Sequence, residues 1–162
     1  MVKDLAKFMA GGSAGSLLTA YLFQKKHERE KFTSDRNKLY LDLVSFWLSN
    51  KNAGKSMRNY LLENDIKNIA VYGMGTMGEL FYEEIENTEI AVECFIDKGA
   101  APSSVGADNI PVIKLNEIRN HAGLDAVIVT PVCYFDSIVS DIVSSGCEIK
   151  IISLEELIYN MK

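Results

Sequence analysis

The six residues from Gly73 to Gly78 constrain the fold more than any other part of the chain. They read Gly-Met-Gly-Thr-Met-Gly and directly follow an apolar run, NIAVY at residues 68–72. Such a run is typical of a strand buried in a parallel sheet. A helix with apolar residues on one face is predicted to begin inside the glycine segment and to continue to about Ile85. A buried strand, a glycine turn and a helix in this order predict a βαβ unit.

The remainder of the C-terminal part alternates apolar runs with helical patterns. Further strands are predicted at residues 90–96, 110–113, 126–129 and 148–152. Because proline removes a ladder donor, Pro111 restricts the third strand to a short or edge position. Right-handed crossovers between parallel strands then give the order 3-2-1-4-5. We therefore predict the α/β class, with a Rossmann-like parallel five-stranded sheet preceded by N-terminal helices.

Two tetrapeptides have the form of a helix capping box. They are TMGE at residues 76–79 and SLEE at residues 153–156. In this motif a hydroxyl side chain accepts from a backbone amide three residues later, and the acidic side chain binds back. The first is expected to open the helix after the first strand, and the second to open the terminal helix.

The chain divides into three segments: residues 1–31, 32–65 and 66–162. The first contains an uncharged run at residues 8–24, flanked by Lys7 and Lys25. As a helix, this run would be roughly 25 Å long, slightly short of a bilayer core of about 30 Å. Positive charges follow it, which would place the rest of the chain on the cytoplasmic side. We interpret the first segment as a hydrophobic helix and membrane anchor, with a soluble helix packed on the domain or on a partner as the alternative.

The second segment is predicted to be a helical lead-in made of two helices. Apolar residues between Leu39 and Leu48 recur at helical spacing, and Trp47 belongs to this stripe. The triplet Asn-Ala-Gly at residues 52–54 is expected to end the first helix. Ser56 is a suitable N-cap for a short second helix.

Composition argues against two classes of function. The net charge is −5 with the acidic residues spread along the chain, whereas a nucleic-acid binder has a basic stripe. The cysteines, at positions 94, 133 and 147, have no CxxC or Cys/His spacing, so we predict no metal site. Reduced thiols indicate a cytosolic environment for the globular part.

The glycine turn has the residue types needed to bind the phosphates of a nucleotide. Gly73 permits a tight turn, Gly75 lets a pyrophosphate approach the backbone, and Gly78 allows the helix to pack closely on the sheet. The start of the helix offers free N–H groups and the positive end of its dipole. The predicted phosphate-binding residues are therefore Gly73, Met74, Gly75, Thr76, Met77 and Gly78.

Further candidate ligand-binding residues lie where the second and fourth strands end. Asp97 lies 19 residues after Gly78, where a carboxylate accepts hydrogen bonds from ribose hydroxyls. Lys98 offers charge to a phosphate, with an exposed loop lysine as the alternative. Thr130 and Pro131 end the fourth strand at the point where the strand order reverses, which is where ligands lie in open α/β sheets.

The segments at residues 73–78, 95–97 (FID) and 127–131 (VIVTP) carry a resemblance that covers about 95 residues. This part resembles the nucleotide-sugar-binding N-terminal domain of bacterial sugar acetyltransferases. It is also similar to Rossmann modules attached to bacterial cell-surface polysaccharide enzymes. The resemblance implies binding of NAD(P) or a nucleotide sugar through Gly73, Gly75, Gly78 and Asp97. It also implies that the catalytic groups lie in an attached domain, which we expect to be missing here.

Three functions remain open from the sequence, and no catalytic residue is predicted. The first is a nucleotide-binding module that acts with a partner in cell-surface carbohydrate metabolism. The second is a small NAD(P)-dependent oxidoreductase or epimerase completed by oligomerisation, using residues such as Cys133, Tyr134 or His121. The third is a structural or interaction protein that binds nothing. We expect a cytoplasmic domain anchored to the inner face of the cell membrane, with a second copy or a partner enzyme as its partner.

Among ligands, NAD is expected to fit better than NADP, and coenzyme A is an alternative. The reason is Asp97, because a carboxylate suits free ribose hydroxyls while coenzyme A carries a 3′-phosphate and NADP a 2′-phosphate.

Overall fold

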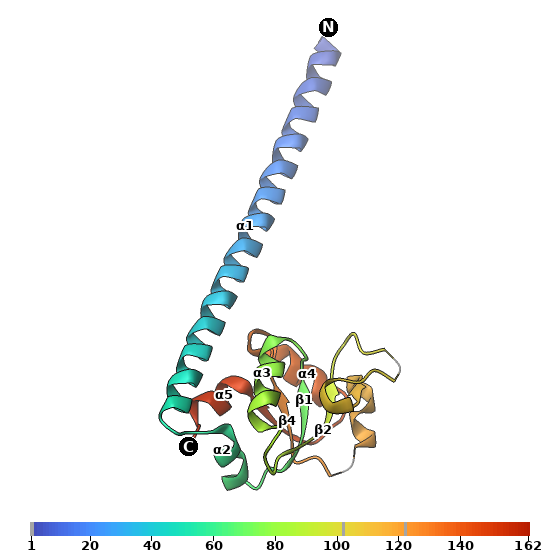
Figure 1. Cartoon of the computed structure of the whole chain (residues 1–162). Helices are drawn as coiled ribbons and strands as arrows, with labels where there is room; N and C mark the ends of the chain where they lie inside the picture. Colours follow the sequence, from blue (N-terminus) through green and yellow to red (C-terminus); the bar gives the residue numbers. More distant parts are fainter. Residues whose placement is uncertain (1, 102, 122) are drawn as a thin grey trace. The chain divides into compact units, whose positions relative to one another are not determined.

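A computed structural model of the chain describes residues 2–101, 103–121 and 123–162, with side chains described from residue 18 onward. The chain forms two compact units, Met1–Asp42 and Leu43–Lys162. One helix, α1 (Val2–Asn52), runs from the first unit into the second, where it contributes its last turns (Figure 1). All the elements that follow α1 belong to the second unit.

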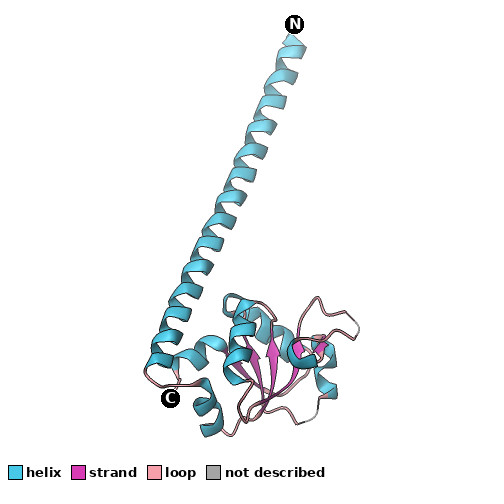
Figure 2. Cartoon of the chain, viewed as in Figure 1, coloured by secondary structure: helices cyan, strands magenta, loops and turns pink. Residues whose placement is uncertain are grey.

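A five-stranded parallel sheet forms the centre of the second unit (Figure 2). Its order is β3-β2-β1-β4-β5, so the predicted fold class and the predicted order 3-2-1-4-5 are both confirmed. β3 has only two residues and lies at an edge, as expected from the proline that precedes it. The strands are β1 (Asn68–Tyr72), β2 (Ala91–Ile96), β3 (Val112–Ile113), β4 (Ala126–Val129) and β5 (Lys150–Ser153).

Helices cover both faces of this sheet. On one face, Tyr72 of β1 and Ile96 of β2 belong to the same buried cluster as Ile138 of α4. On the other face, Phe95 of β2 makes an edge-to-face ring contact with Tyr82 of α3, with centroids 5.5 Å apart. The α-helices after α1 are α2 (Met57–Glu63), α3 (Thr76–Ile85), α4 (Phe135–Ser144) and α5 (Leu154–Tyr159). Short 3₁₀ segments are η1 (Ala107–Asn109), η2 (Leu115–Asn120) and η3 (Val132–Tyr134).

The helix starts agree with the sequence at two places and differ at one. Ser153 caps α5, its hydroxyl accepting from the Glu156 amide at 2.9 Å, and Ser56 caps α2 as predicted. The capping box expected at residues 76–79 is wrong. Thr76 is already helical, and the N-cap of α3 is Gly75, which has no side chain to cap with. The helix begins one residue early because the Gly75 carbonyl already accepts from Glu79 at 3.0 Å.

The two predicted N-terminal helices form one helix across the boundary near residue 32. α1 continues to Asn52 because no glycine or proline occurs between residues 16 and 53. Of the predicted anchor at residues 8–24, the side chains of residues 8–17 lie outside the described residues. Among the described residues, no helix combines the length and apolarity needed to cross a bilayer.

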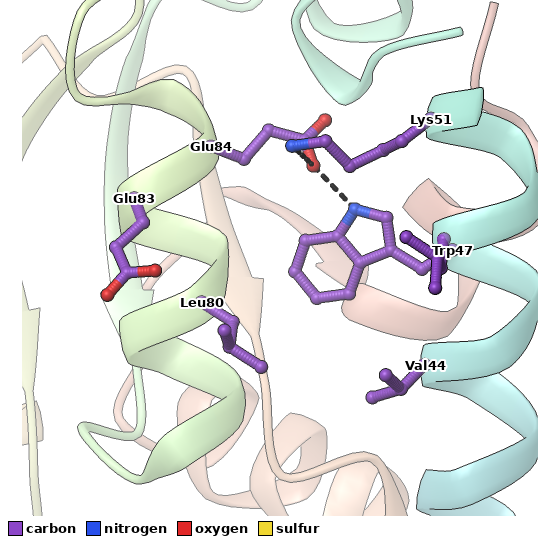
Figure 3. A pocket seen from close by; sticks show the side chains of 7 residues that line it. Val44, Trp47, Lys51, Leu80, Glu83 and Glu84 are labelled. Atoms are coloured by element: carbon purple, nitrogen blue, oxygen red, sulfur yellow. Dashed lines mark hydrogen bonds and ion pairs between the residues drawn. The ribbon is translucent and has the colours of Figure 1, made fainter. Parts of the chain in front are cut away.

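The carboxylate of Glu84, in the last turn of α3, joins this helix to the end of α1, as Figure 3 shows. It also binds the start of α2. It accepts from Trp47 Nε1 at 2.5 Å and from the Met57 amide at 3.0 Å. The Lys51 ammonium lies 3.3 Å away, and only 5% of the Glu84 side chain is exposed. Trp47 is therefore held in the core of this unit, as its place in the apolar stripe predicts.

Replacing Glu84 with alanine is expected to destabilise the protein. The change leaves two buried N–H groups, of Trp47 and Met57, without an acceptor, so the free energy of unfolding should fall by roughly 2–4 kcal/mol. Urea denaturation followed by circular dichroism measures this. Glu83→Ala is the matched control, because Glu83 is exposed on the same helix. Equal losses in the two variants would contradict the described role of Glu84.

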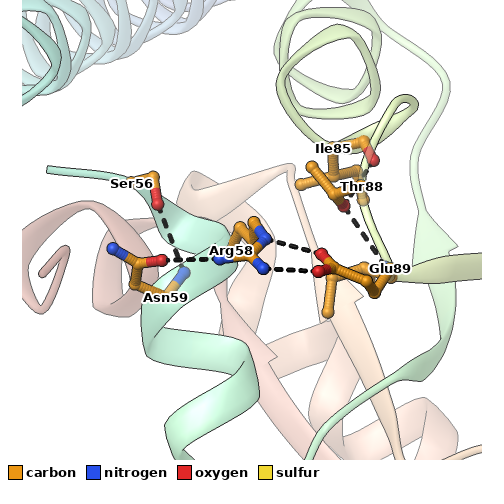
Figure 4. Close-up of polar contacts among 7 residues, drawn as sticks. Ser56, Arg58, Asn59, Ile85, Thr88 and Glu89 are labelled. Atoms are coloured by element: carbon orange, nitrogen blue, oxygen red, sulfur yellow. Dashed lines mark hydrogen bonds and ion pairs between the residues drawn. The ribbon is translucent and has the colours of Figure 1, made fainter. Parts of the chain in front are cut away.

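An ion pair ties α2 to the turn that precedes β2 (Figure 4). The Arg58 guanidinium donates to both carboxylate oxygens of Glu89, at 2.6 and 2.5 Å. These hydrogen bonds lower the pKa of Glu89 to about 2. Its pKa in the folded state therefore lies below its ordinary value of 4.5.

The depressed pKa of Glu89 gives the ion pair a defined pH dependence. Its contribution to stability is complete above about pH 4.5 and is lost as the pH falls toward 2. Glu89→Gln should therefore be modestly less stable than wild type at pH 7, and the difference should disappear near pH 2. Denaturant midpoints across this range provide the measurement. A difference of constant size down to pH 2 would argue against the ion pair.

Candidate functional site

The turn between β1 and α3 has a backbone that only glycine can adopt at its first position. Gly73 has a φ of +98°, in the left-handed region. A Cβ atom there would lie 2.7 Å from Pro131 Cγ and 2.9 Å from Thr130 Oγ1. The conformation and the close approach of β4's end therefore both require glycine, in the role that the sequence predicts for Gly73.

The first helical turn of α3 lies in close contact with the loop that joins β1 to α3. A Cβ on Gly78 would lie only 2.1 Å from the Gly73 carbonyl oxygen. The Thr130 hydroxyl is 3.1 Å from the carbonyl oxygens of both Tyr72 and Gly73, so its proton is shared between them. Thr130 is 2% exposed, and its hydroxyl is used in these two hydrogen bonds within the chain. Its side chain therefore stabilises the turn between β1 and α3.

Gly75 differs from the other glycines whose surroundings the structure describes. Its φ of −80° and ψ of −179° suit any residue, and a Cβ there would have no heavy atom within 4 Å. A Cβ on Gly54 or Gly123 would also have no heavy atom within 4 Å, but their φ values of +78° and +99° lie in the left-handed region, which favours glycine. Neither conformation nor packing within the described part of the chain requires a glycine at position 75.

Free backbone amides surround Gly75 at the start of α3. The amides of Gly78 and Glu79 donate to the Gly75 carbonyl, at 2.7 and 3.0 Å. Those of residues 74–77 donate to no acceptor in the described ranges of the chain. Gly75 and Thr76 are exposed, and Met77 is half-buried. This end of α3 therefore presents unpaired donors and the positive end of the helix dipole to solvent.

The predicted residues at the end of β2 lie at the same edge of the sheet. Asp97 is half-buried, and its Oδ1 accepts from the Gly99 amide at 2.7 Å, which leaves the second oxygen for another donor. The Lys98 ammonium lies 2.8 Å from Asp141 Oδ2 on α4. This contact raises the pKa of Lys98 and directs its charge to the α4 face.

A hollow of about 270 Å³ lies on the α3 face next to Met74. Tyr82 lines it and donates to Asp108 Oδ2 at 2.6 Å, which raises the pKa of Tyr82 to about 12. Glu79 and other carboxylates also line it, so its charge is unfavourable for a phosphate. The exposed amides at the start of α3 are therefore the better anion site.

Sequence reasoning missed Tyr72, the last residue of β1. Its side chain is 4% exposed, and its hydroxyl has no hydrogen-bond partner among the described residues. Burial raises its pKa, and Lys98, Asp141 and Asp97 are the charges that act on it. The apolar pattern of residues 68–72 predicts a buried side chain here, but only the structure shows that the hydroxyl is unpaired.

The nucleophiles and bases considered from the sequence are not brought together. Cys133 and Tyr134 lie in η3, which follows β4, while His121 follows η2 and lines a cavity with residues of the β3 edge. β2 and β1 separate these two places in the sheet. Cys94 is buried, which raises the pKa of its thiol to about 12. Within the described residues no cluster of His, Cys, Asp and Glu could hold a metal ion.

The fold and the turn define an α/β domain with a parallel sheet and with exposed backbone amides at its carboxyl edge. The sequence model of the family described as "C2185-like, N-terminal" matches residues 65–153, which is more than half of the chain. The chain belongs to this family. A comparison with curated proteins finds no match.

Gly78→Ala is expected to damage the fold. The added methyl group would overlap the Gly73 carbonyl oxygen, so α3 must move, at a cost of about 1–3 kcal/mol or more in the free energy of unfolding. Gly75→Ala is the matched control and should change it by less than about 1 kcal/mol. Thermal or urea unfolding compares the two. If Gly78→Ala were as stable as wild type, the close contact between α3 and the turn would be wrong.

Proposed function

We propose that this protein is a nucleotide-binding module, and that it holds the diphosphate of NAD(P) or of a nucleotide sugar on the first turn of α3. The observation that carries the proposal is Gly75, where neither conformation nor packing among the described residues requires a glycine. A residue without a side chain is needed where a ligand must touch the backbone. Gly75 meets that description beside free amides.

The electrostatics of the turn suit an anion. The first amides of a helix and its dipole together favour negative charge at this end. Gly73 and Gly78 hold these amides at the carboxyl edge of β1, where the strand order reverses between β1 and β4. Ligands of open α/β sheets bind at this position.

The residues beside the turn favour some nucleotides over others. The free carboxylate oxygen of Asp97 suits a ribose diol, and it would repel a 2′- or 3′-phosphate. We therefore favour NAD or a nucleotide sugar over NADP and coenzyme A.

The role that we propose for the module is to present its nucleotide to a partner in cell-surface carbohydrate metabolism. The resemblance to the nucleotide-sugar-binding domains of sugar acetyltransferases supports this setting, since in those proteins the catalytic groups usually lie elsewhere. The alternative, a small oxidoreductase or epimerase, would need a second copy of the chain, because β1 and β2 lie between the places of Cys133 and His121 along the sheet.

Gly75→Val tests the proposal. The branched side chain would occupy the space above the amides, so affinity for a diphosphate should fall more than about tenfold, a loss above roughly 1.4 kcal/mol. Isothermal titration calorimetry with NAD, UDP-glucose and ADP measures this. The melting temperature is the control and should stay close to that of wild type. The proposal fails if the variant binds as tightly as wild type, or if wild type binds none of the three.

A further inference from the structure

The hydroxyl group of Tyr72 is buried without a hydrogen-bond partner among the described residues. Its residue is 4% exposed and ends β1, the middle strand of the sheet. A buried hydroxyl normally has a partner, because leaving one unpaired is costly. The Tyr72 hydroxyl is therefore a candidate to bind a polar group of a ligand.

Tyr72 belongs to an apolar cluster, and charged groups act on its hydroxyl. The Tyr72 ring lies in the cluster that contains Ile96 of β2, Ile138 and Ile142 of α4. Asp141 lies between the two α4 residues, and Lys98 follows two residues after the β2 residue. The Lys98–Asp141 ion pair therefore joins β2 to α4 at the end of the sheet where the Tyr72 hydroxyl is buried.

This ion pair is exposed to solvent and is easily displaced. Its side chains are 71% and 44% exposed. Exposed pairs contribute little to stability, so a ligand that offers new partners to both groups can separate them at small cost. The charges of both Lys98 and Asp141 act on the Tyr72 hydroxyl, so the ion pair lies near it.

We propose that Tyr72, Lys98 and Asp141 form a subsite for the hydroxyl groups of a sugar that the bound nucleotide carries. The inference rests on the proposed function, because the diphosphate on α3 would deliver the sugar. Tyr72 immediately precedes Gly73, so the subsite adjoins the phosphate turn.

The chemistry of the three groups favours a neutral polyhydroxyl ligand over an anion. Lys98 donates, Asp141 accepts, and the Tyr72 hydroxyl can do either. A sugar ring offers several hydroxyl groups, which can accept from the ammonium and donate to the carboxylate at the same time. A further phosphate or carboxylate would meet the negative charges of Asp141 and the neighbouring Asp97 with only one lysine to offset them.

The test compares matched nucleotides on the full chain. Isothermal titration calorimetry gives dissociation constants for UDP and UDP-glucose, and for ADP and ADP-glucose. The ratio within each pair measures what the sugar adds to affinity. Wild type should bind at least one sugar nucleotide more tightly than its sugar-free diphosphate.

Tyr72→Phe should reduce that sugar-dependent gain by about two- to tenfold and leave the affinity for the sugar-free diphosphate unchanged. The variant should not melt below wild type, since it removes an unpaired buried hydroxyl. Asp141→Asn should reduce the gain in the same direction. Tyr82→Phe is the matched control: its hydroxyl is engaged by Asp108 on the α3 face, so the gain should persist.

The outcomes separate this inference from the proposed function. If wild type binds none of the diphosphates, the proposed function and the subsite both fail. If wild type binds them but gains nothing from the sugar, only the subsite is overturned. It is also overturned if Tyr72→Phe keeps the full gain, or weakens both members of a pair equally.

Discussion

The contact between Gly78 and the carbonyl group of Gly73 determines where every other feature of the site lies. It brings the first turn of α3 so close to the end of β1 that no Cβ fits between them. Thr130 fixes the other side of the turn by sharing its hydroxyl proton between the Tyr72 and Gly73 carbonyl groups. The start of α3 is thereby held at the edge where β1 and β4 meet.

The buried carboxylate of Glu84 holds the far end of the same helix. It binds Trp47 of α1 and the first amide of α2, so α3 is anchored at both ends. The free amides around Gly75 are therefore presented by a helix that the surrounding structure fixes in place. Amides that are already ordered before a ligand binds do not incur the entropy cost of being ordered on binding.

Much of this arrangement follows from local sequence patterns. The predictions agree with the structure for the buried strands at residues 68–72 and 126–129, the sheet order and the cap at Ser153. These features follow from the spacing of apolar residues, the handedness of crossovers and the capping preference of hydroxyl side chains, which can be read from the sequence. The roles of Gly73 and Gly78 also agree. The predicted cap at residues 76–79 is wrong because the Gly75 carbonyl already accepts from Glu79, which starts the helix one residue earlier, at a glycine.

Features that depend on contacts between distant residues could not be predicted. Thr130 was expected to face a ligand, yet its hydroxyl binds carbonyl groups of β1 and the turn, 57 and 58 residues away. Lys98 forms an ion pair with Asp141, 43 residues away in the sequence, and no local sequence pattern predicts that pair. The unpaired hydroxyl of Tyr72 likewise becomes visible only once the sheet and α4 are assembled around it.

The most direct measurement of the central claim is a titration of the ¹⁵N-labelled protein with UDP, ADP and NAD, followed by amide chemical shifts. The account predicts that the largest shifts fall on the amides of residues 74–77, with smaller ones at Asp97. Saturable shifts that fall elsewhere and leave these amides unmoved would contradict it, as would the absence of any saturable shift.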